Sequence, residues 1–248
     1  MDANFRFYAE LNEFLPKVSQ YQTLHITFKD CQSVKHLIES NGIPHTEVDM
    51  VLVNGQSVDF SYLVRQGDRV AVYPVFESMG ISPLLKLRPA PLRVARFVLD
   101  GHLGRLAAYL RMLGFDALYR NDYDDLELAQ ISAEQKRILL TRDRGLLKRS
   151  LVTRGYCLRT RDPRQQLLDV VRRFDLFDQI QPFTRCMACN GNLRPVDKAE
   201  IEAQLQPLTR RYFQEFSHCD RCGQIYWKGS HHEHMQTLLA WLEESDRN

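Results

Sequence analysis

Short runs of alternating apolar and polar residues occupy the first part of the chain, a pattern typical of strands with one buried face. Residues 5–10 and 23–28 alternate in this way, and residues 69–76 form a further run of the same kind. Between them, apolar residues at helical spacing predict a helix over 33–40. Two strands, a helix and then further strands predict a β-grasp α+β domain over residues 1–79.

A cluster of prolines indicates a linker over 80–92, and beyond it apolar strands alternate with amphipathic helices. One strand ends at Asp100 and is followed by a helix over 102–113, and another strand ends just before Asp143. Unbroken apolar strands that alternate with helices form parallel sheets covered on both faces. Residues 93–180 are therefore predicted to be an α/β domain.

The charge of the chain is divided unevenly. Hydrophobic residues make up 44% and charged residues 26%, as in ordinary globular proteins, and the net charge is +2. However, residues 87–180 carry 18 basic against 12 acidic residues, while residues 1–86 carry 7 against 10. Most of the basic residues in the middle segment are arginines, whose planar guanidinium suits bidentate contacts with phosphate. A partner that bears phosphate groups is therefore indicated.

The sequence lacks the patterns of membrane insertion and secretion. No run of 18 residues is free of charge, and no basic segment followed by an apolar run opens the chain. We therefore expect a cytoplasmic protein without a membrane partner. In that reducing compartment, cysteines in close pairs favour metal binding over disulfides.

Two C-x-x-C pairs predict a zinc ribbon over residues 181–248. The pairs are Cys186 with Cys189 and Cys219 with Cys222. Four thiolates make a closed tetrahedral Zn²⁺ site, which is structural because no position remains for water. The alternative, a redox C-x-x-C, would explain one pair and leave the other unused. The lone cysteines, Cys31 and Cys157, are predicted to be buried small apolar residues.

Carboxylates follow two of the predicted strands. Asp100 and Asp143 each come at a strand end, and an acidic run from Asp122 to Asp125 precedes a further helix. Functional groups of parallel sheets gather at the carboxyl ends of strands, and three carboxylates there would hold Mg²⁺ or Mn²⁺ through oxygen ligands. Such an ion supports phosphodiester cleavage. The alternative is that each aspartate forms a turn or caps a helix.

Three segments carry a resemblance to a known family. They are LDGHLGRLAAYLRMLGFD, which contains Asp100, the acidic DYDDLELA, and RILLTRDRGLLKR, which contains Asp143. They resemble the PIN-like ribonuclease domain of the Mut-seven C-terminal family, over roughly residues 93–234. Bacterial members are also similar to this chain in carrying an N-terminal ubiquitin-like module. The resemblance implies a ribonuclease that depends on Mg²⁺ or Mn²⁺.

The resemblance implies roles for individual acids. The aspartate after the first strand matches Asp100, the aspartate that opens the second helix best matches Asp125, and the aspartate of the T-R-D motif matches Asp143. Asp124 is an alternative for the second position, and Thr141 of the T-R-D motif is a candidate to assist through its hydroxyl. A fourth acid is not identified by any motif, so the number of metal ions stays open.

The residues expected to contact nucleic acid lie in two segments. The segment YWKGSH, after the second C-x-x-C pair, resembles the family and offers Trp227 for stacking on a base and Lys228 and His231 for phosphate. The alternative for Trp227 is that its ring covers the zinc knuckle. The other segment surrounds Asp143, and its basic residues are expected to position the strand: Arg142, Arg144, Lys148 and Arg149.

Together these features predict a ribonuclease built from a β-grasp module, a PIN-like α/β domain and a zinc ribbon. The expected substrate is RNA, single-stranded or tRNA-like, and the β-grasp module is a candidate site for a protein partner. The alternative is a non-catalytic RNA-binding or adaptor protein whose acids are structural. A sulfur carrier is excluded, because carriers use a free C-terminal Gly-Gly and this chain continues far beyond Gly80.

Overall fold

The computed structural model describes residues 1–74 and 95–246, so the linker predicted over 80–92 lies outside the described residues. The backbone packs into two compact units, and each is described by itself. Unit 1 contains residues 1–74 and 123–158, and unit 2 contains residues 95–122 and 159–246. None of the helices in the described part of the chain has the length and hydropathy that a membrane span needs.

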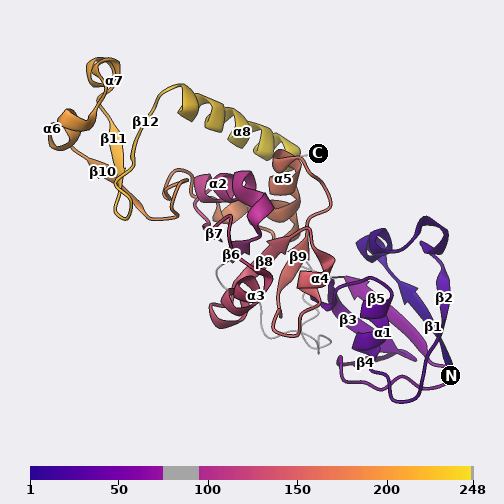
Figure 1. Ribbon diagram of the computed structural model, residues 1–248. Helices are drawn as coiled ribbons and strands as arrows, with labels where there is room; N and C mark the ends of the chain where they lie inside the picture. Colours follow the sequence, from indigo (N-terminus) through magenta and orange to yellow (C-terminus); the bar gives the residue numbers. More distant parts are fainter. Residues whose placement is uncertain (75–94, 247–248) are drawn as a thin grey trace. The chain divides into compact units, whose positions relative to one another are not determined.

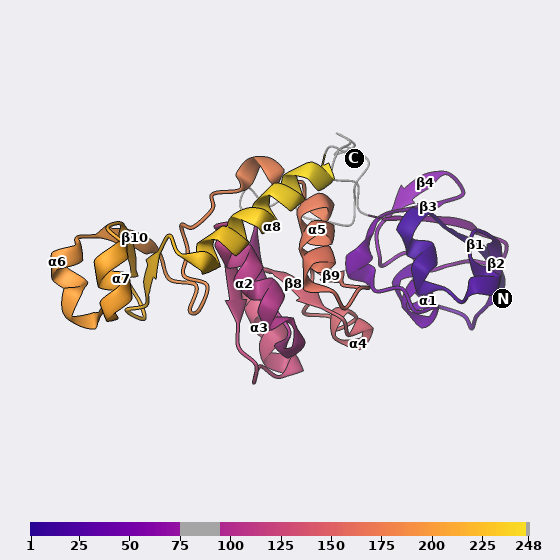
Figure 2. The same cartoon turned by 90° about the horizontal axis from the view of Figure 1, so that it is seen from above.

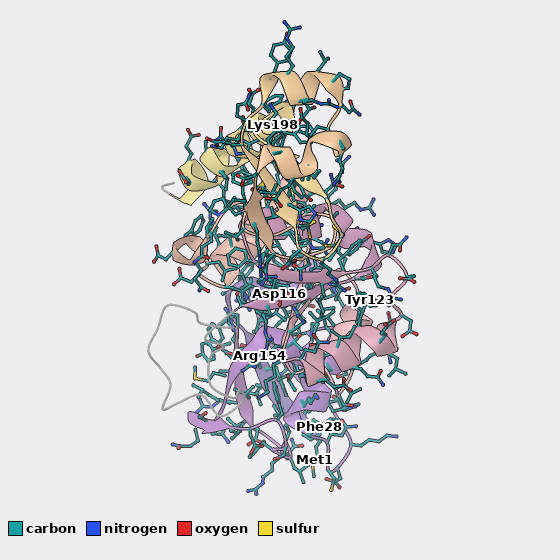
Figure 3. All side chains as sticks on the ribbon, turned by 90° about the vertical axis from the view of Figure 1, so that its left-hand side faces the viewer. Met1, Phe28, Asp116, Tyr123, Arg154 and Lys198 are labelled. Carbon is teal, nitrogen blue, oxygen red and sulfur yellow. The ribbon has the colours of Figure 1, made fainter. Side chains whose placement is uncertain are left out.

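A five-stranded sheet forms the N-terminal part of unit 1 (Figure 1). Its strands are β1 (Asp2–Phe7), β2 (Thr23–Thr27), β3 (Val48–Val53), β4 (Gln56–Val58) and β5 (Arg69–Pro74). The order is β2-β1-β5-β3-β4, with β1 antiparallel to β2 and parallel to β5. Met1 and Phe28, at the open end of the β1–β2 pair, are joined by backbone hydrogen bonds and lie together in Figure 3.

Helix α1 (Val34–Ser40) covers one face of this sheet and begins where the sequence predicts it. Ser33 caps the helix, because its Oγ accepts a hydrogen bond from the backbone N–H of His36 at 3.2 Å. Leu37 and Ile38 are buried, as are the phenylalanines of β1. Strand, helix and strand order together confirm the ubiquitin-like β-grasp fold.

The first strand begins and ends three residues earlier than predicted. β1 stops at Phe7, and the 3-10 helix η1 (Ala9–Phe14) occupies the end of the predicted strand. Ala9 has a φ of 45°, and the Asn12 side chain donates to the carbonyl oxygens of Phe7 and Ala9 at 2.9 and 3.0 Å. A local bond from side chain to backbone thus turns the chain, which hydrophobic alternation does not reveal. Two further 3-10 helices are η2 (Lys17–Ser19) and η3 (His45–Glu47).

The middle of the chain alternates strands and helices, which confirms the α/β class. Its strands form a sheet of order β7-β6-β8-β9 and are β6 (Arg96–Leu99), β7 (Asp116–Tyr119), β8 (Ile138–Thr141) and β9 (Gly155–Cys157). The pairs β6–β7 and β8–β9 are parallel. The helices are η5 (Gly101–Leu103), α2 (Gly104–Met112), α3 (Asp125–Glu134), α4 (Arg144–Leu147), α5 (Pro163–Arg173) and η6 (Phe177–Gln179).

The C-terminal part of unit 2 contains a small antiparallel sheet of order β10-β11-β12. Its elements are β10 (Leu193–Val196), α6 (Lys198–Ile201), η7 (Glu202–Gln204), α7 (Pro207–Tyr212), β11 (Phe216–Cys219), β12 (Ile225–Trp227) and α8 (Ser230–Asp246). The residues between the two C-x-x-C pairs thus contain short helices. Helix α8 packs on α5, and both views show it as one unbroken helix (Figure 2).

Candidate functional site

Four cysteine side chains gather at one point of unit 2. The sulfur atoms of Cys186, Cys189, Cys219 and Cys222 all lie within 4.8 Å of one another. Cys186 Sγ is 3.6 Å from Cys222 Sγ, and Cys189 Sγ is 3.4 Å from Cys219 Sγ. Among the described residues, this cluster is the one group of three or more His, Cys, Asp or Glu side chains close enough to share an ion. The donor set fits tetrahedral zinc.

Tight backbone turns aim these sulfurs at one another. In the first turn, Asn190 has a φ of 68°, and the backbone N–H of Gly191 points at Cys189 Sγ at 3.4 Å. In the second turn, Gly223 has a φ of 74°, and the N–H of Arg221 points at Cys219 Sγ at the same distance. Backbone donors to sulfur stabilise thiolates, so both turns are built for a charged ligand set.

The thiols of the cluster have divergent acidities. Burial acts to raise the pKa of Cys186, but the hydroxyl of Tyr226, 3.1 Å from its sulfur, and nearby backbone amides lower this pKa to about 7. Burial instead raises the pKa of Cys189 to about 12. Four thiolates at this spacing repel one another, so full deprotonation requires a cation among them. The residues present therefore fit a structural metal ion.

The first cysteine turn is anchored to α2 and β7. Arg111, which is only 4% exposed, donates from one guanidinium nitrogen to the carbonyl oxygens of Met187 and Ala188 at 2.9 Å each. Asn190 Oδ1 accepts from the N–H of Ala117 at 3.1 Å, and its amide donates to Asp116 at 2.7 Å. Asp116, labelled in Figure 3, opens β7. No sequence motif pointed to these contacts, which join residues more than 70 positions apart.

The aspartates of unit 1 separate into capping and paired groups. Asp124 caps α3, because its Oδ1 accepts from the N–H of Glu127 at 2.8 Å. The neighbouring Asp125 is the first residue of α3, is exposed, and forms an ion pair with Arg149 at 3.3 Å. Asp124 therefore stabilises the start of α3, and Asp125 presents its carboxylate at the surface.

Asp143 lies directly after β8 and has both a capping contact and an exposed side chain. Its Oδ1 accepts from the N–H of Gly145 at 2.6 Å, at the start of α4. The hydroxyl of Thr141, a buried residue, accepts from the N–H of Asp143 at 2.9 Å and fixes the backbone there. The capping alternative is thus realised for Asp143, but it occupies only one carboxylate oxygen.

In unit 2, Asp100 follows β6 at the N-cap of η5, and its side chain forms no capping hydrogen bond there. Asp162, in contrast, caps α5 through the N–H groups of Arg164 and Gln165 at 3.0 and 2.9 Å. Asp100 belongs to unit 2, whereas Asp125 and Asp143 belong to unit 1.

Two of the basic residues near Asp143 contact the β-grasp module within unit 1. The Arg144 guanidinium donates to Phe14 O at 3.2 Å and lies 4.9 Å from the centre of the Phe14 ring. Lys148 Nζ donates to Glu39 O at 2.5 Å. Arg142 is exposed. The helix that follows Asp143 is therefore attached to the ubiquitin-like module.

A second set of contacts joins η3 of the β-grasp module to β9 and its preceding turn. The Glu47 carboxylate is fully buried and accepts from the N–H of Cys157 at 2.6 Å. His45 Nε2 lies 2.8 Å from Val152 O, and its Nδ1 lies 2.7 Å from Glu39 Oε1. Buried polar groups of this kind are retained only with hydrogen-bond partners. Cys157 is buried as predicted, whereas Cys31 is exposed, in a turn with a φ of 61°.

The aromatic segment after the second cysteine pair borders a cavity of about 470 Å³ in unit 2. Trp227 is 39% exposed, and its ring centre lies 6.3 Å from that of Phe213. Lys228 forms an ion pair with Glu215 at 2.6 Å. His232, in the first turn of α8, packs its ring against another aromatic side chain of the cavity. The side chain of His231 lies outside the described residues.

Two family models match the chain. One, described as the Mut7-C RNAse domain, matches residues 95–239, which is more than half of the chain. The other, described as Mut7-C ubiquitin, matches residues 1–80. Among curated proteins, the exonuclease mut-7 homolog of Homo sapiens is 35% identical over 119 residues, which are 46% of this chain and only 13% of that protein. No solved structure matches the chain.

Proposed function

Because the chain belongs to the Mut7-C RNAse domain family, a nuclease family, we propose that it is a ribonuclease that hydrolyses RNA phosphodiester bonds with a bound Mg²⁺ or Mn²⁺. The observation that carries this proposal is the family match itself, because it contains the two strand ends and the helix start at which Asp100, Asp143 and Asp125 stand. The likeness to the exonuclease homolog supports nuclease chemistry but covers a small part of that relative.

Asp100, Asp125 and Asp143 are the proposed metal ligands. Carboxylate oxygens are the ligands that both ions prefer, and the exposed Asp125 and Asp143 have carboxylate oxygens facing solvent. When bound, the ion would lower the pKa of a water molecule and neutralise charge on the phosphate. The carboxylate donors therefore suit the proposed Mg²⁺ or Mn²⁺.

The chain's own residues would hold the reactants in place. The Thr141 hydroxyl accepts from the N–H of Asp143 and fixes the backbone there, and the capping contact with the Gly145 N–H uses the Oδ1 atom of Asp143. Arg142 is exposed beside Asp143 and is the proposed contact for a substrate phosphate. Arg149 pairs with Asp125 and would be released to phosphate when that carboxylate binds a cation. Trp227, Lys228 and His231 are also proposed to contact RNA.

The four-cysteine cluster is proposed to bind one structural Zn²⁺. A closed set of four thiolates stabilises a fold and leaves no position for substrate. The ubiquitin-like module is proposed to dock partners through surfaces that unit 1 leaves exposed.

The test is cleavage of a labelled single-stranded RNA, with single-stranded DNA as a control, by the full chain with Mg²⁺ or Mn²⁺. Asp143→Asn keeps an oxygen that accepts from the Gly145 N–H, so stability should be unchanged. It removes the charge, so cleavage should fall at least about a hundredfold. Asp178→Asn, an exposed aspartate of η6 outside the proposed site, should cut like wild type.

Equal cleavage by wild type and Asp143→Asn would exclude the proposed site. Absence of cleavage by wild type in both metals, with RNA still bound, would instead support the second candidate function, a non-catalytic RNA-binding adaptor. The observation that favours this candidate is that Asp124, Asp143 and Asp162 all cap helices.

A further inference from the structure

The β-grasp module carries a hollow on the exposed face of its sheet. Its volume is about 750 Å³, and it spreads over β1, β2, β3 and β5, all within unit 1. The hollow lies on the face opposite the one that α1 covers, because its lining residues alternate with the buried core residues of the same strands. Its lining includes Asn4, Arg6, Tyr8, His25, Arg69 and Tyr73.

The hollow exists because a small residue stands at its centre. Ala71 lies in the middle of β5, and its cross-strand neighbours are Arg6 on β1 and Leu52 on β3. Longer side chains stand around it. The floor is therefore open backbone and methyl groups, and the rim carries the polar and aromatic groups.

The charge of the rim is of one sign. Residues 1–74 contain 6 basic and 9 acidic residues, yet no Asp or Glu lines the hollow, whereas Arg6 and Arg69 both do. Two acids close in sequence to the lining, Asp2 and Asp68, already accept hydrogen bonds. Asp2 accepts from the Gln66 amide at 2.6 Å, and Asp68 is buried and accepts from Asn54. An acidic module thus presents a basic face.

Two tyrosines form an aromatic platform at one end of the hollow. The rings of Tyr8 and Tyr73 are stacked, with centres 4.4 Å apart and planes at 6°. Tyr8 is 38% exposed, so the outer part of the pair faces solvent. Stacked aromatic rings beside a basic groove are the features with which proteins bind single-stranded nucleic acid.

We propose that this sheet face binds single-stranded RNA, with phosphates at Arg6 and Arg69 and a base stacked on Tyr8. The inference rests on the proposed function in one respect, since it takes RNA as the polyanion that the protein meets. It deepens that function by adding a second RNA contact, on the ubiquitin-like module. A protein partner fits the face less well, because Tyr8 is the one large exposed hydrophobic side chain of the lining, and protein interfaces have apolar cores.

The test measures binding separately from cleavage. Anisotropy of a fluorescent single-stranded RNA is titrated with the full chain in the Asp143→Asn background, without added Mg²⁺ or Mn²⁺, and the RNA is recovered intact on a gel. The double variant Arg6→Glu/Arg69→Glu should weaken binding at least about tenfold. It should also reduce the slope of log affinity against log salt by about 1.4, at about 0.7 for each lost phosphate contact.

A matched control changes the same charge elsewhere on the module. Lys35 lies on α1, which covers the opposite face of the sheet, and Lys29 precedes that helix. Lys29→Glu/Lys35→Glu should leave the affinity within about twofold, and melting temperatures should show that both double variants are folded. Equal weakening by both doubles would mean that net charge alone acts and would overturn the proposal. Unchanged affinity in Arg6→Glu/Arg69→Glu would overturn it too and favour a protein partner for this face.

The stacking contact has its own pair of variants. Tyr8→Phe keeps the ring and should keep the affinity, whereas Tyr8→Leu removes it and should weaken binding about tenfold. Equal affinities would exclude a base on Tyr8. Cleavage by the otherwise wild-type chain in Mn²⁺ separates the two proposals. Its absence would overturn the ribonuclease and leave this binding result standing, and active cleavage with no effect of the sheet-face variants would overturn only this inference.

Discussion

Asn190 joins the first cysteine turn to the sheet with a single amide group. Its backbone has the left-handed conformation that asparagine tolerates better than most residues, and its side chain bonds both Ala117 and Asp116. The side chain is 7% exposed, so its loss would leave buried polar groups without partners. The Asn190 side chain therefore joins the first cysteine turn to strand β7.

Asn190→Ala should lower the free energy of unfolding by about 2 to 4 kcal/mol, because a buried N–H is left unsatisfied and the backbone becomes strained. Asn192→Ala, two residues on and exposed, should change it by less than about 0.5 kcal/mol. Urea denaturation of zinc-loaded protein measures both. Similar values for the two variants would show that the side-chain bonds of Asn190 contribute nothing.

In unit 1, Glu47 likewise uses its side chain to join two segments that are far apart in the sequence. Glu47→Ala removes the acceptor of the buried Cys157 N–H and should destabilise the protein by about 2 to 3 kcal/mol. Glu47→Gln keeps an accepting oxygen and should cost less. Hydrogen exchange at the Cys157 amide should become faster in both variants, and the increase should be larger in Glu47→Ala than in Glu47→Gln. Unchanged exchange in both would contradict the contact.

At the residue scale, the sequence predicts sites whose residues have a fixed short spacing. It does not predict contacts between residues that only the fold brings together. The four cysteines are identified because two short C-x-x-C turns carry their own geometry. Arg111, Asn190 and Glu47 are invisible beforehand, because their partners lie between 70 and 110 positions away. The same limit applies to Arg144, which resembles a phosphate contact in the sequence and lies against Phe14 in the structure.

At the scale of elements, the start of α3 separates two adjacent acids. Asp124 supplies the cap and Asp125 the first helical carboxylate. Both fit the family's second acidic position by sequence, and only the capping hydrogen bond distinguishes them. The geometry therefore favours Asp125 as the proposed metal ligand.

Exchanging each acid in turn tests that distinction. Asp124→Ala should cost about 1 kcal/mol of stability and leave most of the Mn²⁺-dependent cleavage, while Asp124→Ser should restore the stability. Asp125→Asn should be as stable as wild type and should lose cleavage at least about a hundredfold. Melting curves and RNA cleavage at saturating Mn²⁺ measure the two effects. Loss of cleavage in Asp124→Ser with full activity in Asp125→Asn would reverse the assignment.

Elements with local start signals are predicted well, and short or mixed ones are not. Helices α1 and α5 begin where Ser33 and Asp162-Pro163 mark them. Strand β7 is missed because Asp116–Tyr119 has a single fully buried residue and no alternation. Helix α8 is missed because its first turn is rich in histidine, and the sequence there instead suggested a phosphate contact for His231. Its apolar positions, such as Leu238 and Leu242, are the signal that was available.

At the scale of the molecule, the match to the Mut7-C RNAse domain runs through both the α/β strands and the cysteine cluster. The contacts of unit 2 give a physical reason for this continuity. The buried guanidinium of Arg111 is satisfied by the backbone of the first cysteine turn, so α2 and that turn depend on each other. The cysteine cluster is therefore part of the folded core of unit 2.

Loss of the metal should consequently weaken the hydrogen bonds that join the first cysteine turn to β7. Cys222→Ser is the test variant, because Cys222 is exposed and its sulfur adds nothing to the core. Cys31→Ser is the control, because it changes an exposed cysteine outside the cluster. Wild type and Cys31→Ser should carry about one zinc per chain by atomic emission, and Cys222→Ser should carry far less.

Without the ion the first turn loosens, so the Ala117 amide, which donates to Asn190, should exchange with solvent at least about tenfold faster in Cys222→Ser. Zinc loss with unchanged exchange at Ala117 would show that the ribbon folds independently, and the dependence between the turn and α2 would be disproved.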